Sequence, residues 1–308
     1  MASWLLGTGI MLIHVLGMIS AVMALMSSRT SQGAVAWIIS LLTFPYAAVP
    51  VYWLFGRPRF YGYVTARGAR DSVLRRVLVR YRHNVKPHVA ISDNTDIQAV
   101  EQLAMMPLTK GNSTELLIDG DATFDSLFAG INQAQDYLLI QFFIVRDDEL
   151  GRQLQQHLIA AVKRGVRVYF LYDEIGSRKL NDGYLNELST SGAEVTPFRS
   201  SRGLKHRFQL NFRNHRKIAV VDGKQGWIGG FNVGNEYLGK SAKHGPWRDT
   251  HLKVQGPCVL GLQEAFWEDW HWATGDVITL NWHAESHPQQ DQQVVIVPSG
   301  PADKQDTA

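Results

Sequence analysis

The segment that begins at His215 combines residue types that could transfer a phosphoryl group. At the spacing H-x-K-x4-D-x6-G-G-x-N it contains His215, Lys217, Asp222, Gly229, Gly230 and Asn232. A histidine can attack phosphorus as a nucleophile or carry a proton. A lysine and an asparagine amide can hold phosphate oxygens and stabilise the charge that develops in the transition state. The pattern therefore predicts a phosphoryl-transfer site.

The local pattern predicts how these residues are presented. Residues 216–222 are typical of a strand that ends in a turn at Asp222-Gly223. Because side chains alternate along a strand, His215 and Lys217 would point to the same face. Asp222, the third polar residue of the pattern, lies where a strand-end carboxylate could accept structural hydrogen bonds. The alternative interpretation is an ordinary strand that carries two surface cations.

The glycine pair has a predicted role of its own. Gly229 and Gly230 have no side chain, so the backbone there could come close to a bound phosphate. Asn232 follows directly, and its amide is the expected hydrogen-bond donor to the phosphate.

The stretch 211–237 resembles the HKD motif of the phospholipase D superfamily, in particular that of membrane-anchored bacterial cardiolipin synthases. Other parts of the chain agree with that family in the same order. They are an N-terminal hydrophobic hairpin and the segments 141–148, 172–177 and 247–251. The resemblance implies a phospholipase D-like layered α/β domain, with a mainly parallel mixed sheet flanked by helices. It also implies chemistry that needs no metal and no cofactor.

The resemblance further implies phosphatidyl transfer through a phosphohistidine. Phosphatidylglycerol would give its phosphatidyl group to a histidine and release glycerol, and a second phosphatidylglycerol would then accept the group to form cardiolipin. His215 is the expected nucleophile or its acid partner, with Lys217 and Asp222 completing the catalytic motif. The carboxylate that orients the imidazole would be Asp249, with Glu236 as the alternative.

Members of that family carry a second HKD half, which would begin near residue 298, shortly before the last residue of this sequence, Ala308. Three hypotheses follow. The chain could be an enzyme that completes its site by homodimerisation or by pairing with a second HKD half. It could be a truncated, inactive half of a cardiolipin synthase. It could instead be a membrane-bound protein that binds lipid or a homologous chain. Simple hydrolysis, as in a phospholipase D-type phosphodiesterase, is the alternative activity.

Two stretches near the N-terminus, residues 4–26 and 34–55, contain no Asp, Glu, Lys or Arg. Each is long enough to cross a bilayer as a helix, which takes about 20 residues. Residues 57–86 then contain nine Lys or Arg residues, whereas Arg29 is the only one between the two spans. This bias predicts that the following domain is cytoplasmic. The expected location is the bacterial inner membrane, with a multi-pass anchor.

The basic stretch also indicates contact with anionic phospholipid headgroups. Nucleic-acid binding is not expected beside membrane spans, and the formal net charge of +3 does not argue for it.

The remaining sequence predicts the domain organisation. We expect a two-helix transmembrane hairpin at 1–56, a basic connector at 57–110, a phospholipase D-like domain at 111–297 and a polar tail at 298–308. Within the domain, strands and amphipathic helices alternate from residue 116 to residue 198. A last helix at 259–272 carries an apolar stripe that we expect in the core. Trp267 and Trp270 of that stripe, and Trp247, are alternatively candidates for an exposed association surface.

Overall fold

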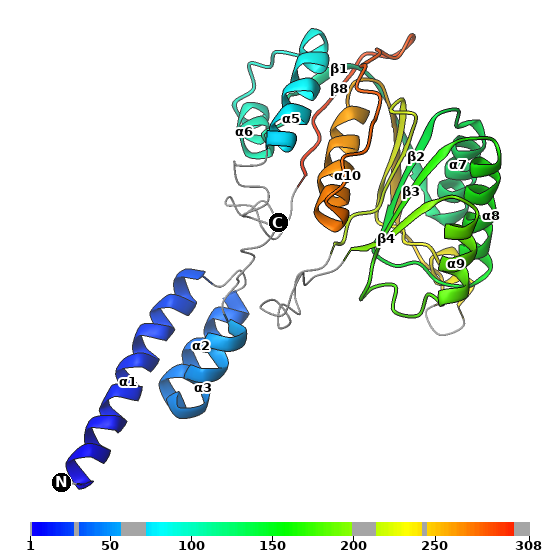
Figure 1. Ribbon diagram of the computed structural model, residues 1–308. Helices are drawn as coiled ribbons and strands as arrows, with labels where there is room; N and C mark the ends of the chain where they lie inside the picture. The colour runs from blue at the N-terminus through cyan, green and yellow to red at the C-terminus, as the bar shows by residue number, and fades with distance from the viewer. Residues whose placement is uncertain (1, 28–30, 57–71, 199–213, 242–244, 299–308) are drawn as a thin grey trace. The chain divides into compact units, whose positions relative to one another are not determined.

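The computed structural model describes residues 2–27, 31–56, 72–198, 214–241 and 245–298, and these form two compact units. The first unit contains the described residues up to Gly56, and the second contains those from Ser72 onward (Figure 1).

The first unit is built from apolar helices. They are α1 (Ala2–Ser27), α2 (Ser31–Thr43), α3 (Pro45–Val51) and the π-helical turn η1 (Tyr52–Gly56). In α1, the segment Gly7–Met26 is long and apolar enough to cross a membrane. The second expected span, 34–55, is not one continuous helix. It breaks at Phe44, because the ring of Pro45 disfavours helical backbone in the residue before it.

The helices of this unit pack against each other through small and apolar side chains. The buried cluster consists of Ala21, Ala24, Leu41, Ala48, Val49 and Tyr52. A hydrogen bond of 3.0 Å from Trp53 Nε1 to Ser20 Oγ joins η1 to α1. The hairpin-like arrangement is thus held by side chains from both predicted spans.

The second unit contains an eight-stranded sheet in the order β4-β3-β2-β5-β6-β7-β1-β8. Its strands are β1 (Thr109–Ile118), β2 (Tyr137–Phe142), β3 (Arg167–Asp173), β4 (Glu194–Phe198), β5 (Ile218–Val221), β6 (Gln225–Gly229), β7 (Thr250–Gln255) and β8 (Gln292–Val294). Its helices are α5 (Ser72–Val85), α6 (Thr95–Ala104), α7 (Asp119–Gln133), α8 (Glu149–Lys163), α9 (Asp182–Thr190) and α10 (Val259–Thr274), with short turns η2 (Lys86–His88) and η4 (Asn235–Leu238).

The layered α/β fold is confirmed, but the sheet is only partly parallel. The strands β2, β3 and β4 run parallel, and every other pairing is antiparallel. The tight β5–β6 hairpin explains part of this difference. Asp222 and Gly223 both have positive φ, and Lys224 N donates to Val221 O, as a hairpin turn requires. The expectation of a mainly parallel sheet therefore holds only for β2–β4.

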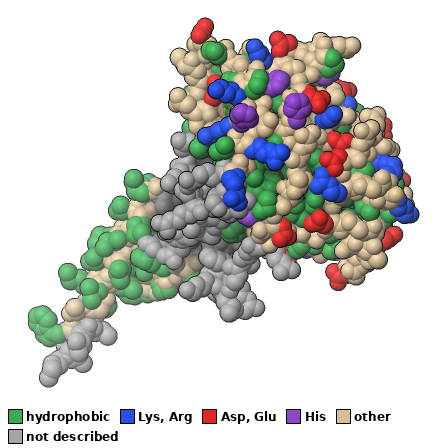
Figure 2. Space-filling model, turned by 45° about the horizontal axis from the view of Figure 1, so that its top comes forward, with side chains coloured by type: hydrophobic (Ala, Val, Ile, Leu, Met, Phe, Trp, Pro, Cys, Tyr) green, Lys and Arg blue, Asp and Glu red, His purple; other side chains and the backbone are tan. Residues whose placement is uncertain are grey.

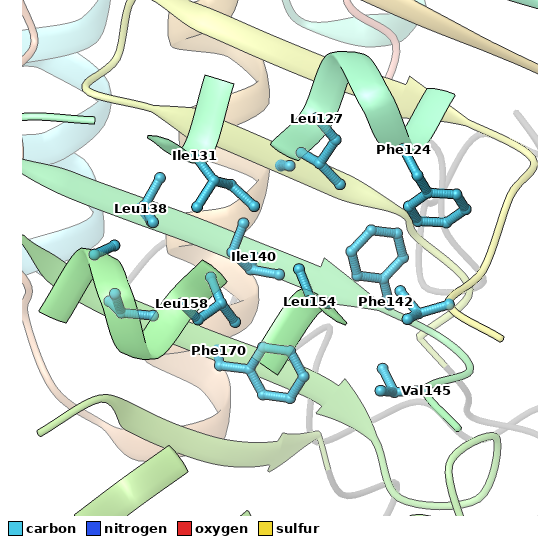
Figure 3. Packing of buried hydrophobic residues seen from close by; sticks show 14 of the residues in the cluster. Phe124, Leu127, Ile131, Leu138, Ile140, Phe142, Val145, Leu154, Leu158 and Phe170 are labelled. Atoms are coloured by element: carbon cyan, nitrogen blue, oxygen red, sulfur yellow. The ribbon is translucent and has the colours of Figure 1, made fainter. Parts of the chain in front are cut away.

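Helices cover both faces of the sheet (Figure 1). On one face, β2 presents Leu138, Ile140 and Phe142 to a core that contains side chains of α7 and α8 (Figure 3). The other face carries α10. In this helix Trp267 and Trp270 are buried, which confirms the core interpretation and rules both out as parts of an exposed association surface.

Candidate active site

The elements of the predicted site meet at one edge of the sheet. The pairing directions bring together the carboxyl ends of β1, β2, β3 and β6 and the amino ends of β5 and β7. The segments 141–148, 172–177 and 247–251, which resemble the superfamily, all adjoin strands at this edge. In Figure 3, Phe142 lies at the arrowhead of β2 and Val145 lies just beyond it. Residues far apart in the sequence are therefore brought together because the buried strands that carry them are neighbours in the sheet.

The central row of this edge is Lys217, Gly229 and His251. Gly229 pairs with His251 of β7, and the β5–β6 register places Lys217 opposite Gly229 on the other side. A Cβ atom on Gly229 would lie 2.6 Å from both Cα and Cγ of His251. Because Gly229 has no side chain, the space beside its Cα is open to Lys217 and His251 on the neighbouring strands.

His215 and Lys217 form the closest polar pair of the site. Lys217 Nζ lies 2.9 Å from His215 Nδ1, 3.3 Å from Nε2 and 2.6 Å from the carbonyl oxygen of His215. The ring of Phe143 packs 4.5 Å from the His215 ring, measured between centroids. Because an ammonium only donates hydrogen bonds, it leaves a ring nitrogen of His215 as an unprotonated acceptor.

The charges of this pair follow from their surroundings. Lys217 is only 5% exposed, and its burial lowers the pKa of its ammonium to about 8, while Asp249 acts in the opposite direction. Burial, followed by the charge of Lys217, lowers the pKa of His215. Near neutral pH the site therefore combines a neutral imidazole with a mostly protonated lysine, the forms that a nucleophile and an oxyanion-stabilising group need.

Asp249 lies in this site, but not where an orienting carboxylate was expected. Its Oδ1 accepts a hydrogen bond from Thr250 N at 2.7 Å. Among the residues that the structure describes, no hydrogen bond joins it to His215. A Cβ atom on Gly230 would lie 2.1 Å from Asp249 Oδ1, so this glycine makes room for the carboxylate. Gly229 and Gly230 thus make room for neighbouring side chains, and their close approach to a phosphate stays a prediction.

His251 is a residue of the site that the motif did not indicate. It is 3% exposed, and its Nδ1 accepts a hydrogen bond of 3.3 Å from Phe231 N. Burial lowers the pKa of His251 to about 4, with Asp249 and Lys217 acting in opposite directions. A neutral imidazole therefore lies beside the Lys217 ammonium. Alternation along β7 gave no signal for it, because His251 shares its face of the strand with the polar residues Lys253 and Gln255.

A buried polar network holds the chain directly before the catalytic pair. Asn214 N donates to Asp173 Oδ2 at 2.9 Å, and Asn214 Nδ2 donates to Asp269 Oδ2 at 2.7 Å. The same Asp269 oxygen accepts from Gln141 Nε2 at 2.8 Å and from Arg216 Nη1 at 2.7 Å. Side chains from β2, β3 and α10 therefore fix both neighbours of His215, and the interior charge of Asp269 is paired.

Asn232 holds a loop of the site. Its Oδ1 accepts from Ile144 N at 2.9 Å, and its Nδ2 donates to the hydroxyl of Tyr237 at 3.1 Å. One amide hydrogen remains for a ligand. Glu236 pairs with Arg146 at 3.2 Å, and the structure shows no hydrogen bond between Glu236 and His215, both described residues.

Asp222 lies at the other end of β5 from the catalytic pair. Its carboxylate accepts hydrogen bonds of 2.9 Å from the backbone N–H groups of Gln135, Asp136 and Tyr137. These bonds attach the β5–β6 turn to the start of β2. These are the contacts of a structural carboxylate at the end of a strand, as the position of Asp222 in the sequence suggested. They do not place Asp222 near the His215–Lys217 pair.

Metal binding has no visible basis in the described part of the chain. No group of three or more His, Cys, Asp or Glu side chains is arranged there to hold an ion.

Comparison with known proteins agrees with the motif and the fold. Residues 127–245 match the family described as "Cardiolipin synthase, PLD-like domain", and residues 9–57 match "Phospholipase_D-nuclease N-terminal". The chain, which carries the HKD motif on a mixed α/β sheet, belongs to the phospholipase D superfamily of enzymes. Within that superfamily it is related to the bacterial cardiolipin synthases.

Two relatives illustrate the similarity. Cardiolipin synthase A of Pseudomonas putida KT2440 is 43% identical over 301 residues, and that of Pseudomonas aeruginosa LESB58 is 43% identical over 303 residues. The alignments cover 96% of this chain but only 62% and 61% of the relatives. The chain thus spans about three-fifths of their length. A solved structure, NucT from Helicobacter pylori, matches with a TM-score of 0.42 and 16% identity, covering 53% of this chain and 98% of NucT.

Proposed function

We propose that this chain is the HKD-bearing part of a phosphatidyltransferase that joins two molecules of phosphatidylglycerol into cardiolipin and glycerol. The observation that carries the proposal is the pair formed by His215 and Lys217, a neutral imidazole within 2.9 Å of a buried ammonium. The similarity to cardiolipin synthases supports this choice of substrate.

In the first step, a ring nitrogen of His215 attacks the phosphorus of phosphatidylglycerol. The phosphorus–oxygen bond to the glycerol headgroup breaks, and the leaving oxygen takes a proton from a general acid. Lys217 stabilises the charge that develops on the phosphoryl oxygens. The products are glycerol and a phosphatidyl group attached to His215.

In the second step, the headgroup hydroxyl of another phosphatidylglycerol attacks that phosphorus. It gives its proton to a general base as the nitrogen–phosphorus bond breaks, so the histidine is regenerated. We propose that the acid and base is the histidine of a second HKD motif, supplied by another copy of this chain or by a second HKD half. In a twofold homodimer, two copies of His215 would share one phosphate site.

The test is lipid analysis of a bacterial host that lacks its own cardiolipin synthases and expresses the full chain. The expected result is the appearance of cardiolipin, which His215→Ala abolishes and which the exposed-site control His283→Ala leaves unchanged. Accumulation of phosphatidic acid instead would favour hydrolysis. If neither lipid appears, even with a second HKD half co-expressed, the transferase proposal is wrong and a lipid-binding role is favoured.

The same host tests how the site is completed. If copies pair, co-expressed His215→Ala chains should lower cardiolipin by more than dilution of wild-type chains explains. Loss in strict proportion to dilution, with a monomer in detergent, would contradict pairing.

A further inference from the structure

The second unit contains a cavity that lies outside the active-site edge. Figure 1 shows α5 and α6 next to each other, and the cavity, with a volume of about 620 Å³, is lined by residues of both helices and of the segments that follow them. Nothing in the phosphatidyl-transfer mechanism uses these residues.

Two cations form one wall of this cavity. Arg82 lies in the last turn of α5 and Lys86 opens the following turn η2, and both line the cavity. Both side chains are exposed, and neither forms an ion pair with any residue that the structure describes. With two cations and one acid, Glu101, in its lining, the cavity keeps a net positive charge.

The opposite wall comes from α6 and is mixed in character. Gln98, Glu101, Gln102 and Met105 recur at helical spacing on one side of this helix. Glu101 is the only acid in the lining, and its Oε1 is engaged, because it accepts a hydrogen bond of 2.6 Å from Leu108 N. An anion that enters can thus meet two cations and two amide side chains.

The lining also contains apolar surface that a small soluble anion would not cover. Met105 is 71% exposed, and Val89, Met106 and Pro107 contribute to the same cavity. An unpartnered cationic wall beside exposed apolar side chains has the chemistry of the boundary between a lipid headgroup and its acyl chains. Figure 2 shows Lys, Arg and His side chains on the visible face of the molecule, with Asp and Glu side chains among them.

The covalent chain keeps α5 within reach of a membrane. The apolar helices end at Gly56 and α5 begins at Ser72, and the intervening segment can span about 55 Å at most. An anionic phospholipid is therefore the phosphate-bearing ligand most readily available to this cavity.

We propose that the cavity between α5 and α6 binds the phosphate headgroup of an anionic phospholipid, with Arg82 and Lys86 on the phosphate and Met105 against the glycerol and acyl region. This site is separate from the catalytic edge and does not rest on the proposed transfer reaction. It would hold the domain against anionic lipid whether or not the HKD site is active.

A fluorescent label beside the cavity tests this directly. Cys258, the single cysteine, is buried, so Leu103→Cys, at an exposed position of α6 outside the lining, can be labelled selectively in the full chain with an environment-sensitive dye. The labelled protein carries His215→Ala and is titrated in non-ionic detergent with dioctanoyl phosphatidylglycerol, dioctanoyl phosphatidylcholine or inorganic phosphate. We expect a saturable change with phosphatidylglycerol and little change with the other two.

Matched variants separate a pocket from general surface charge. Arg82→Gln with Lys86→Gln should weaken the response to phosphatidylglycerol about 25-fold, from a cost of roughly fivefold for each cation. Arg76→Gln with Arg80→Gln removes the same charge from exposed positions of α5 outside the cavity and should leave the response unchanged. Arg82→Lys with Lys86→Arg keeps the charge and should retain binding.

Three results would overturn the proposal. Equal weakening by both glutamine pairs would mean diffuse attraction to α5. An equal response to phosphatidylcholine would mean that the headgroup charge is not recognised. A saturating response to inorganic phosphate at the same concentrations would mean a general phosphate site with no preference for lipid. None of these depends on whether the chain makes cardiolipin.

Discussion

His251 should make the stability of the large unit depend on pH, and this can be measured without any enzymatic activity. The side chain is buried in the central row of the site and accepts a hydrogen bond from Phe231 N through Nδ1. The substitution His251→Asn places an amide oxygen near the position of Nδ1, so it can keep that hydrogen bond while it removes the titratable group.

The expected magnitude follows from the pKa of His251. Burial lowers this pKa from 6.5 to about 4, and each unit corresponds to about 1.4 kcal/mol. The unfolded chain therefore binds more protons than the folded chain between about pH 6.5 and pH 4. The free energy of unfolding is unaffected by this group above that window and falls as the pH drops through it. Between pH 7 and pH 5 the loss is about 2 kcal/mol.

The assay is guanidinium unfolding of the full chain in detergent at pH 7 and pH 5, followed by near-ultraviolet circular dichroism. Other groups also titrate in this range, so the relevant quantity is the difference between the pH effects in the variant and in the wild type. We expect His251→Asn to reduce the loss by about 2 kcal/mol. The exposed-site control His283→Asn should not. An unchanged loss in His251→Asn would refute the neutral, buried state of this imidazole.

Four further predictions address catalysis, packing and topology. His215→Ala should abolish phosphatidyl transfer from labelled phosphatidylglycerol, whereas Lys217→Ala should slow it by about 10²–10³-fold. Wild-type activity should fall above a pH of about 8, because Lys217 loses its proton there. Full activity at pH 9 would contradict this role of Lys217. Gly230→Ala should displace the carboxylate of Asp249 and lower the free energy of unfolding by about 1–3 kcal/mol, measured by denaturation; wild-type stability would argue against this packing. Asp269→Asn should cost about 3–5 kcal/mol in the same measurement, because it leaves the Arg216 guanidinium without its paired carboxylate; a loss below 1 kcal/mol would mean that the network relaxes. A reporter fused after residue 60 should be active in the cytoplasm, and periplasmic activity would reject the proposed orientation.

Local patterns in the sequence predicted the parts of this protein that depend on short segments. The strand at His215, the Asp222-Gly223 turn and the helix that carries Trp267 follow from side-chain alternation, turn residues and helical spacing. The charge-free stretch that became α1 needed only its length and composition. Each of these features is determined within about twenty consecutive residues, and so the sequence was sufficient.

The break at Phe44 shows where such reasoning fails even locally. Composition alone suggested one continuous apolar span over residues 34–55. In the structure the helix is interrupted before Pro45, resumes as α3, and is followed by the π-helical turn η1. Composition predicts that a segment is apolar, whereas the geometry of its backbone depends on individual residues and on packing within the unit.

The arrangement of the site was decided by the tertiary structure. His251 joins Lys217 only because β6 lies between β5 and β7 and carries a glycine at the shared position, and this depends on strand register. Asp249 was expected beside His215, but the register places its carboxylate against Gly230. Asp269 reaches the motif from α10, across the sheet and more than fifty residues along the chain. The sequence by itself determined which residues could do chemistry, whereas the pairing of distant strands determined which of them touch.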